Sequence, residues 1–290
     1  MESMAEKSNK IFILGVGGQK CGTTWLYRYL NSFSHVNMGF CKEYHVWDRK
    51  YSCLHFSQKR LWELRNFSDV RQYFMVSSSG YYENYFSRLI KGNTRITGDI
   101  TPSYAGLTAD AYATIKQRLE AKGFQVKVVF LMRDPVQRCW SSQRMNARQD
   151  KRFRNIDLSD VELNTQFKRS LSGSGFVGRT QYENTIRNLE QVFEPEALYL
   201  GIYETMYELD NLKKLSAFCG VPVKSEFSKK VINRSPSRSL TVENTDACFK
   251  QFRSTYIYCY ERFPETQVHW QADCLLDSSL GDVEREISQC

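Results

Sequence analysis

The feature that most constrains the fold is a buried strand, a glycine-rich turn and a helix, in that order near the N-terminus. Residues 10–16 read KIFILGV, a short apolar run of the kind that forms a buried strand. Glycine, glutamine and lysine follow as far as Gly22. Apolar side chains then recur at intervals of three and four across residues 23–32, which predicts a helix with one buried face. A strand that turns directly into a helix favours a layered α/β fold.

The rest of the chain continues this alternation of apolar runs and helical patterns. Further strands are expected at residues 95–100, 125–132 and 197–202. Helices are expected at residues 109–122, from 135 onward, and at 182–193, 212–218 and 243–263. Asp134 and Pro135 suit the cap and first position of one of them. The fold class predicted is therefore α/β, with a central parallel sheet flanked by helices.

The chain has 290 residues, and no long linker divides it. We expect a single domain over residues 1–290, with a flexible N-terminus at residues 1–9 and a C-terminal helical extension at residues 241–290. Residues 170–178 are rich in serine and glycine, which predicts a loop. Hydrophobic residues make up 41% of the chain and charged residues 25%, which excludes fibrous, disordered and coiled-coil classes.

Composition also bears on location and partners. The net charge of +8 suits an anionic ligand or polymer, although an ordinary soluble surface explains it equally well. No apolar run is long enough to span a membrane, and the polar N-terminus lacks a signal-peptide core. The nine cysteines are odd in number and contain no C-x-x-C pair or zinc spacing. We therefore expect a cytoplasmic protein with reduced thiols and no metal.

The glycine-rich turn has the features of a phosphate-binding loop. Backbone N–H groups at the start of a helix point outward and attract an anion, and Gly22 allows close approach of the backbone. Lys20 adds a full positive charge, and Thr23 and Thr24 add hydroxyls. Thr23 stands where the lysine of a nucleotide triphosphate loop would be, which disfavours an ATPase or kinase. The alternative is an ordinary glycine turn. If the turn is a phosphate-binding loop, the predicted α/β fold is of the P-loop-containing nucleotide-binding type.

A second candidate anion site follows the expected strand at residues 125–132. Arg133 stands at the carboxyl end of this strand, where open α/β sheets bind their ligands. Ser141 follows about two helical turns later, within reach of an arginine that folds back over the helix. The two side chains together could hold one phosphate group. The alternative for Arg133 is a pair with Asp134 or another carboxylate.

Together the two motifs resemble those of the sulfotransferases that use 3′-phosphoadenylyl sulfate (PAPS). The early loop is similar to their 5′-phosphosulfate site, and the pair Arg133 and Ser141 is similar to their 3′-phosphate site. Other segments resemble the glycosaminoglycan-type branch of that family. These segments are His35-Val36, Lys42 to Asp48 (KEYHVWD), Gly98 to Tyr104 (GDITPSY), Gly178 to Leu189 and Phe218 to Val221 (FCGV). The resemblance covers residues 11–240.

The resemblance implies an enzyme that transfers a sulfuryl group from PAPS to a hydroxyl or amine and releases PAP. The implied acceptor is a glycan, a glycolipid or a small metabolite, with no nucleic acid, membrane span or metal involved. The implied catalytic residues are Lys20, Glu43 as the base and His45. The implied donor-binding residues are Gln19, Lys20, Cys21, Gly22, Thr23, Thr24, Trp25, Arg133, Ser141, Tyr182, Arg234 and Arg238.

Some residues depart from the family pattern, and other interpretations stay open. Ile100 stands where part of the branch has a lysine, and the family's late Lys-Gly-Arg loop is only approximated by residues 234–238. Glu43 could instead be an exposed carboxylate paired with Lys42. Asp99 is a further candidate, either to orient Lys20 or to contact the acceptor. The rival functions are a P-loop kinase or nucleotide hydrolase acting on a small metabolite, and a non-catalytic binder of an anionic polymer.

Overall fold

The computed structural model describes residues 10–149, 158–229 and 238–270. The chain forms two compact units. Unit 1 comprises residues 1–132 and 185–232, and unit 2 comprises residues 133–184 and 233–290. The single-domain organisation expected from the sequence stays a prediction. No helix in the described ranges is long and apolar enough to cross a bilayer.

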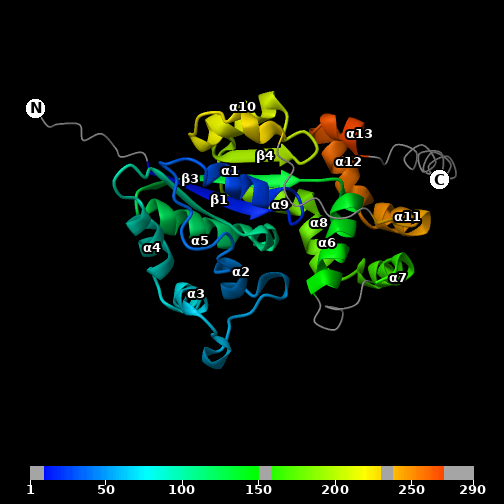
Figure 1. Ribbon diagram of the computed structural model, residues 1–290, viewed down its shortest axis with the longest axis horizontal. Helices are drawn as coiled ribbons and strands as arrows, with labels where there is room; N and C mark the ends of the chain where they lie inside the picture. The colour runs from blue at the N-terminus through cyan, green and yellow to red at the C-terminus, as the bar shows by residue number, and fades with distance from the viewer. Residues whose placement is uncertain (1–9, 150–157, 230–237, 271–290) are drawn as a thin grey trace, which may run out of the picture. The chain divides into compact units, whose positions relative to one another are not determined.

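Unit 1 is built on a four-stranded parallel sheet with the order β2-β1-β3-β4 (Figure 1). The strands are β1 (Lys10–Gly17), β2 (Ile96–Ile100), β3 (Phe124–Met132) and β4 (Leu198–Ile202). The two central strands are buried along most of their length, which explains why their sequences are mainly apolar. This confirms the α/β class and all four strand predictions. Because the strands are parallel, their carboxyl ends meet at one edge, where the glycine loop begins.

Helices cover both faces of this sheet (Figure 1). The helices of unit 1 are α1 (Thr23–Leu30), α2 (Trp47–Lys50), α3 (Phe67–Ser77), α4 (Tyr81–Leu89), α5 (Ala109–Glu120) and α10 (Leu209–Cys219). One face of β1 and β3, which includes Ile13 and Leu131, packs with buried side chains of α1 and α10. The opposite face carries Phe12, whose ring contacts the ring of Phe86 on α4 at 4.9 Å. Apolar burial on both faces fixes the position of β1 and of the loop that follows it.

Unit 2 is helical. Its helices are α6 (Pro135–Gln149), α7 (Asp160–Ser170), α8 (Ser174–Thr180), α11 (Val242–Gln251), α12 (Arg253–Arg262) and α13 (Glu265–His269). The helix α9 (Tyr182–Glu190) spans the boundary between the units. The predicted cap of α6 is confirmed, because Asp134 Oδ1 accepts a hydrogen bond of 2.8 Å from the N–H of Gln137.

Two predictions in unit 2 were wrong. The segment 170–178 is not a loop, because α8 occupies its second half. Phe176 and Thr180, four residues apart, are both buried, and the Phe176 ring packs 6.0 Å from that of Phe167. This packing outweighs the low helix propensity of the serines and glycines. The helix expected at residues 243–263 is two helices that meet at Phe252, a buried residue with φ −114° and ψ 23°.

Candidate functional site

The loop between β1 and α1 has the geometry expected of an anion site. Gly22 caps α1 with φ +89°, a left-handed conformation that glycine adopts without strain. A Cβ at Gly22 would lie 2.8 Å from the sulfur of Met206, so any other residue would also have to displace that side chain. The N–H of Gly18 donates to Leu131 O at 2.5 Å, which ties the loop to β3. The first N–H groups of α1, together with its dipole, thus form a fixed positive end at the edge of the sheet.

The other predicted donor-binding residues of this loop fall into two groups, partly exposed and buried. Gln19, Lys20 and Thr24 are partly exposed, whereas Cys21, Thr23 and Trp25 are buried. Trp25 stacks on Tyr29 at 5.2 Å in the core beneath α1. The side chains of Cys21 and Trp25 are therefore turned into the core, and only their backbone remains for a ligand at the loop. Their contact with a nucleotide stays a prediction.

The segment 42–48 lies beside the carboxyl ends of β1 and β2. The N–H of Ile100 donates to the carbonyl of Lys42 at 3.3 Å, and the N–H of Tyr44 donates to Thr101 Oγ1 at 3.0 Å. The N–H of Thr101 in turn donates to Gly15 O of β1 at 3.0 Å. These bonds place a segment without strand structure next to the loop that begins at the end of β1.

Lys42 joins this segment to the first residue of α1. Its Nζ donates to Glu43 Oε1 at 2.6 Å and to Thr23 Oγ1 at 3.2 Å. The pairing of Glu43 with Lys42 that the sequence left as an alternative is therefore present. The same lysine also reaches the glycine loop, so the predicted base lies one side chain away from the predicted phosphate site. This ammonium supplies a cation near the loop, while Ile100 is buried in the core.

Glu43 and His45 form the charged centre of the segment. His45 Nε2 lies 3.3 Å from Glu43 Oε2, and His45 Nδ1 lies 2.6 Å from Asp48 Oδ2. Burial opposes the charged form of Glu43, but hydrogen bonds from His45 and Lys42 outweigh it and lower its pKa to about 2. Burial opposes the charge on His45 too, yet its bonds to Asp48 and Glu43 raise its pKa to about 9. At neutral pH His45 is thus an imidazolium that donates both N–H groups, so it cannot accept a proton.

Asp48 and its neighbours hold the imidazole in place. Asp48 is fully buried and accepts hydrogen bonds from the N–H of Arg49 at 2.8 Å and from the Ser103 hydroxyl. The His45 ring stacks on Phe56 with ring centroids 4.6 Å apart. The sequence prediction missed Asp48 and Ser103 as supports and Lys42 as a bridge. The E-x-H-x-x-D spacing of residues 43–48 is the signal that could have indicated Asp48.

Asp99 does not have one of the two roles expected of it, contact with the acceptor; the other role, to orient Lys20, stays a prediction. Its side chain is completely buried and accepts hydrogen bonds from Tyr82 at 3.0 Å, Tyr104 at 2.8 Å and Thr101 at 2.6 Å. Burial raises its pKa to about 6, although these three hydroxyls oppose the rise. The expectation that Asp99 contacts the acceptor was wrong, because no face of its side chain is open to solvent. It instead fixes Thr101, which anchors Tyr44.

The second candidate anion site belongs to unit 2. Arg133 directly follows β3 and is partly exposed, and Ser141 lies on α6 with 5% exposure. Tyr182 is fully buried, and its hydroxyl donates to the carbonyl of Arg133 at 2.7 Å. Tyr182 therefore fixes the backbone of Arg133 rather than presenting its own side chain. Arg238 Nη1 pairs with Asp160 Oδ1 at 3.2 Å. The predicted Arg234 lies outside the described residues.

Comparison with solved structures identifies the class of fold. The chain matches a sulfotransferase from Alicyclobacillus acidocaldarius with a TM-score of 0.56 and 16% identity, over 91% of this chain and 98% of that one. Two further matches have lower TM-scores. A sulfotransferase domain from the curacin biosynthetic pathway gives 0.43 at 18% identity over 84% and 97% of the two chains. The mouse sulfotransferase SULT7A1 complexed with PAP gives 0.44 at 14% identity over 94% and 89%.

These matches concern the fold alone. No protein-family model and no curated protein matches the sequence. The chain has a P-loop-containing nucleotide-binding fold, in which a parallel sheet leads into a glycine-rich loop at the start of a helix. More narrowly, this is the fold of a sulfotransferase, as the match to the bacterial enzyme shows. The fold predicted from the two motifs is thereby confirmed, and the glycosaminoglycan-type branch stays a prediction.

Proposed function

We propose that the protein transfers a sulfuryl group from PAPS to a hydroxyl or amine of an acceptor such as a glycan, glycolipid or small metabolite. The observation that carries this proposal is the double contact of Lys42, which reaches both Glu43 and Thr23. It brings a carboxylate, two partly buried cations and a helix N-terminus together at one edge of the sheet. A site of this composition suits an anionic donor beside a proton acceptor.

The candidate site residues of unit 1 have distinct roles in this reaction. The loop N–H groups and Lys20 hold the 5′-phosphosulfate and stabilise the negative charge that grows on the departing phosphate. The acceptor oxygen or nitrogen attacks sulfur as the bond from sulfur to the phosphate oxygen breaks, and PAP leaves. Glu43 takes the proton that the acceptor loses. His45 holds the Glu43 carboxylate in a fixed orientation, since its imidazolium is itself held by Asp48.

The low pKa of Glu43 makes one further step necessary. A carboxylate with a pKa of about 2 is a weak proton acceptor while both His45 and Lys42 hold it in its charged form. The donor carries several negative charges that compete for the same ammonium. We infer that Lys42 turns from Glu43 toward the donor when it binds. Glu43 then becomes more basic at the moment when a base is needed.

The direct test is incubation with labelled PAPS and a panel of acceptors, with mass detection of an added sulfonate. Lys20→Ala should retain its circular dichroism spectrum and lose product formation. Glu43→Gln should bind PAP normally and lose most of kcat. Lys116→Ala is a matched control, because Lys116 pairs with Glu120 on the surface of α5. Normal turnover by Lys20→Ala, or no product with any acceptor, would contradict the proposal.

The role of Arg133 and Ser141 in holding the 3′-phosphate is a separate part of the proposal. Each charge-assisted hydrogen bond lost should weaken PAP binding by roughly ten- to a hundredfold. Isothermal titration should show tighter binding of PAP than of AMP, and Arg133→Ala should remove that preference. Equal affinity for PAP and AMP in the unaltered protein would exclude this role. Magnesium-dependent turnover of ATP would instead favour the kinase alternative.

A further inference from the structure

Helix α3 is amphipathic in the reverse of the usual sense. The residues that it buries include Asp69 and Gln72, whereas Phe67 and Phe74 on its outer face are 88% and 44% exposed. Phe67, Val70 and Phe74 follow one another at intervals of three and four, so they form one stripe along the helix. A surface helix of a soluble protein normally turns such a stripe toward the core. An exposed stripe of this kind marks a contact surface.

Polar contacts on the inner face hold α3 in this orientation. Asp69 accepts a bond of 2.5 Å from Lys59 Nζ and one of 2.9 Å from the N–H of Arg65. Gln72 Nε2 donates to Glu43 O at 3.2 Å, and its Oε1 accepts from Arg49 at 3.2 Å. Rotating the helix to bury its phenylalanines would break all four bonds. These bonds therefore keep the apolar stripe on the outer face of the helix. The inner face contacts the segment that carries Glu43.

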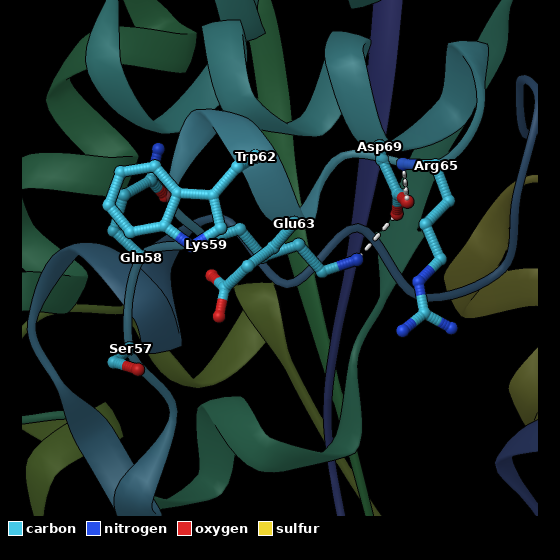
Figure 2. Close-up of a pocket in the computed structure, with 7 residues that line it drawn as sticks. All are labelled: Ser57, Gln58, Lys59, Trp62, Glu63, Arg65 and Asp69. Atoms are coloured by element: carbon cyan, nitrogen blue, oxygen red, sulfur yellow. Dashed lines mark hydrogen bonds and ion pairs between the residues drawn. The ribbon is translucent and has the colours of Figure 1, made fainter.

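The surface continues beyond α3 on both sides. The short turn before the helix exposes Leu61 and Trp62, which are 63% and 76% exposed. Figure 2 shows Trp62 and Arg65 around a hollow of about 690 Å³, with the Lys59 amine reaching across to Asp69. After the helix, the exposed ring of Tyr81 stacks on Phe74 at 6.0 Å. We call this set the α3 surface; its apolar members are Leu61, Trp62, Phe67, Val70, Phe74 and Tyr81.

The charges among these apolar side chains are mainly positive. Arg60, Arg65 and Arg71 are exposed in the same stretch, against the single exposed carboxylate of Glu63. The Arg60 guanidinium lies 5.2 Å from the centre of the Trp62 ring, so a cation and an aromatic ring are in contact at this point of the surface. Asp69, the other acid in the stretch, is buried and paired with Lys59. Exposed tryptophan, phenylalanine and leucine among arginines are the composition of helices that lie in the interface of an anionic bilayer.

We propose that the α3 surface docks on an anionic lipid bilayer, with its aromatic side chains in the headgroup region and its arginines against lipid phosphates. Charge complementarity selects this occupant over a neutral protein surface, because the three exposed arginines among the apolar side chains attract anionic groups. Docking would place the segment of Glu43, which α3 contacts, beside the membrane. This proposal concerns binding and holds whether or not the protein transfers sulfuryl groups.

The test is co-sedimentation of the full chain with vesicles. Vesicles of phosphatidylcholine mixed with phosphatidylserine should bind the protein, and pure phosphatidylcholine vesicles should bind it far more weakly. The triple variant Arg60→Gln, Arg65→Gln, Arg71→Gln should bind anionic vesicles about a hundredfold more weakly, at about fivefold for each arginine. The double variant Phe67→Ser, Phe74→Ser should bind the same vesicles roughly tenfold more weakly, or weaker still. Added salt should weaken the binding of the unaltered protein to anionic vesicles.

Controls separate docking from general effects on the fold. Val161→Ser with Val242→Ser removes two side chains that are 76% and 77% exposed elsewhere, and this pair should bind vesicles normally. Circular dichroism should be the same for all variants, since the changed side chains lie outside the core. Absence of binding to anionic vesicles, or unchanged binding by the triple and double variants, would overturn the proposal. So would light scattering that shows a dimer dispersed by the phenylalanine changes, because the α3 surface would then meet a second copy.

Discussion

The imidazolium of His45 should make the stability of the protein depend on pH in a defined window. The pKa of His45 is about 9 in the folded protein and 6.5 as an ordinary histidine. A group whose pKa rises on folding stabilises the folded state fully below its unfolded pKa, and this stabilisation is lost as the pH rises through its folded pKa. The window is therefore pH 6.5 to 9. A difference of about 2.5 in pKa, at about 1.4 kcal/mol for each unit, sets an upper limit of about 3.5 kcal/mol.

His45→Gln removes this titration and keeps a hydrogen-bonding side chain of similar size. Urea unfolding should show the unaltered protein more stable than the variant by up to about 3.5 kcal/mol at pH 6. The difference should shrink steadily toward pH 9.5. In the unaltered protein Glu43 stays ionised over this range, since its pKa is about 2. His269→Gln removes a histidine at the exposed end of α13 and serves as the matched control. A gap for His45→Gln that does not change with pH would refute the reasoning.

Three further predictions test single contacts. Gly98→Ala should destabilise the fold by about 1–3 kcal/mol in urea unfolding, because its Cβ would lie 2.3 Å from a backbone carbonyl oxygen of β1. Tyr182→Phe should cost about 1–3 kcal/mol in the same assay, because the carbonyl of Arg133 loses a buried donor; unchanged stability would contradict that contact. Lys42→Met should raise the pKa of Glu43 and move the acid limb of the rate profile to higher pH, and an unmoved limb would count against the proposed base.

Much of the fold could be predicted from the sequence because its strongest signals are local. The strands β1 and β3 are buried on both faces over most of their length, so their sequences are mainly apolar, apart from Lys10, Gln125 and Lys127. The cap at Asp134 depends on its own neighbours in the chain. Helix α8 could not be predicted in the same way, because its serines and glycines disfavour a helix and only the contact between Phe176 and Phe167 reverses that preference.

The candidate site was predictable in its parts and not in its connections. Lys20 and Glu43 each stand in a recognisable local pattern. The bond from Lys42 to Thr23 joins residues 19 positions apart, and no periodicity reports a contact of that kind. Asp99 shows the opposite problem, since an acid at the end of a strand suggests an open site. Its burial depends on Tyr82 and Tyr104, which come from other elements.

The attachment of residues 42–48 to the sheet has a consequence for how such a protein can diversify. Bonds to Thr101, Ile100 and Tyr104, together with the buried side chains of Tyr44 and Trp47, set the position of this segment. Insertions or substitutions beyond those anchor points can remodel the neighbouring surface without disturbing the strands or the glycine turn. One lineage could in this way change the molecules it recognises many times over while its core machinery stays the same.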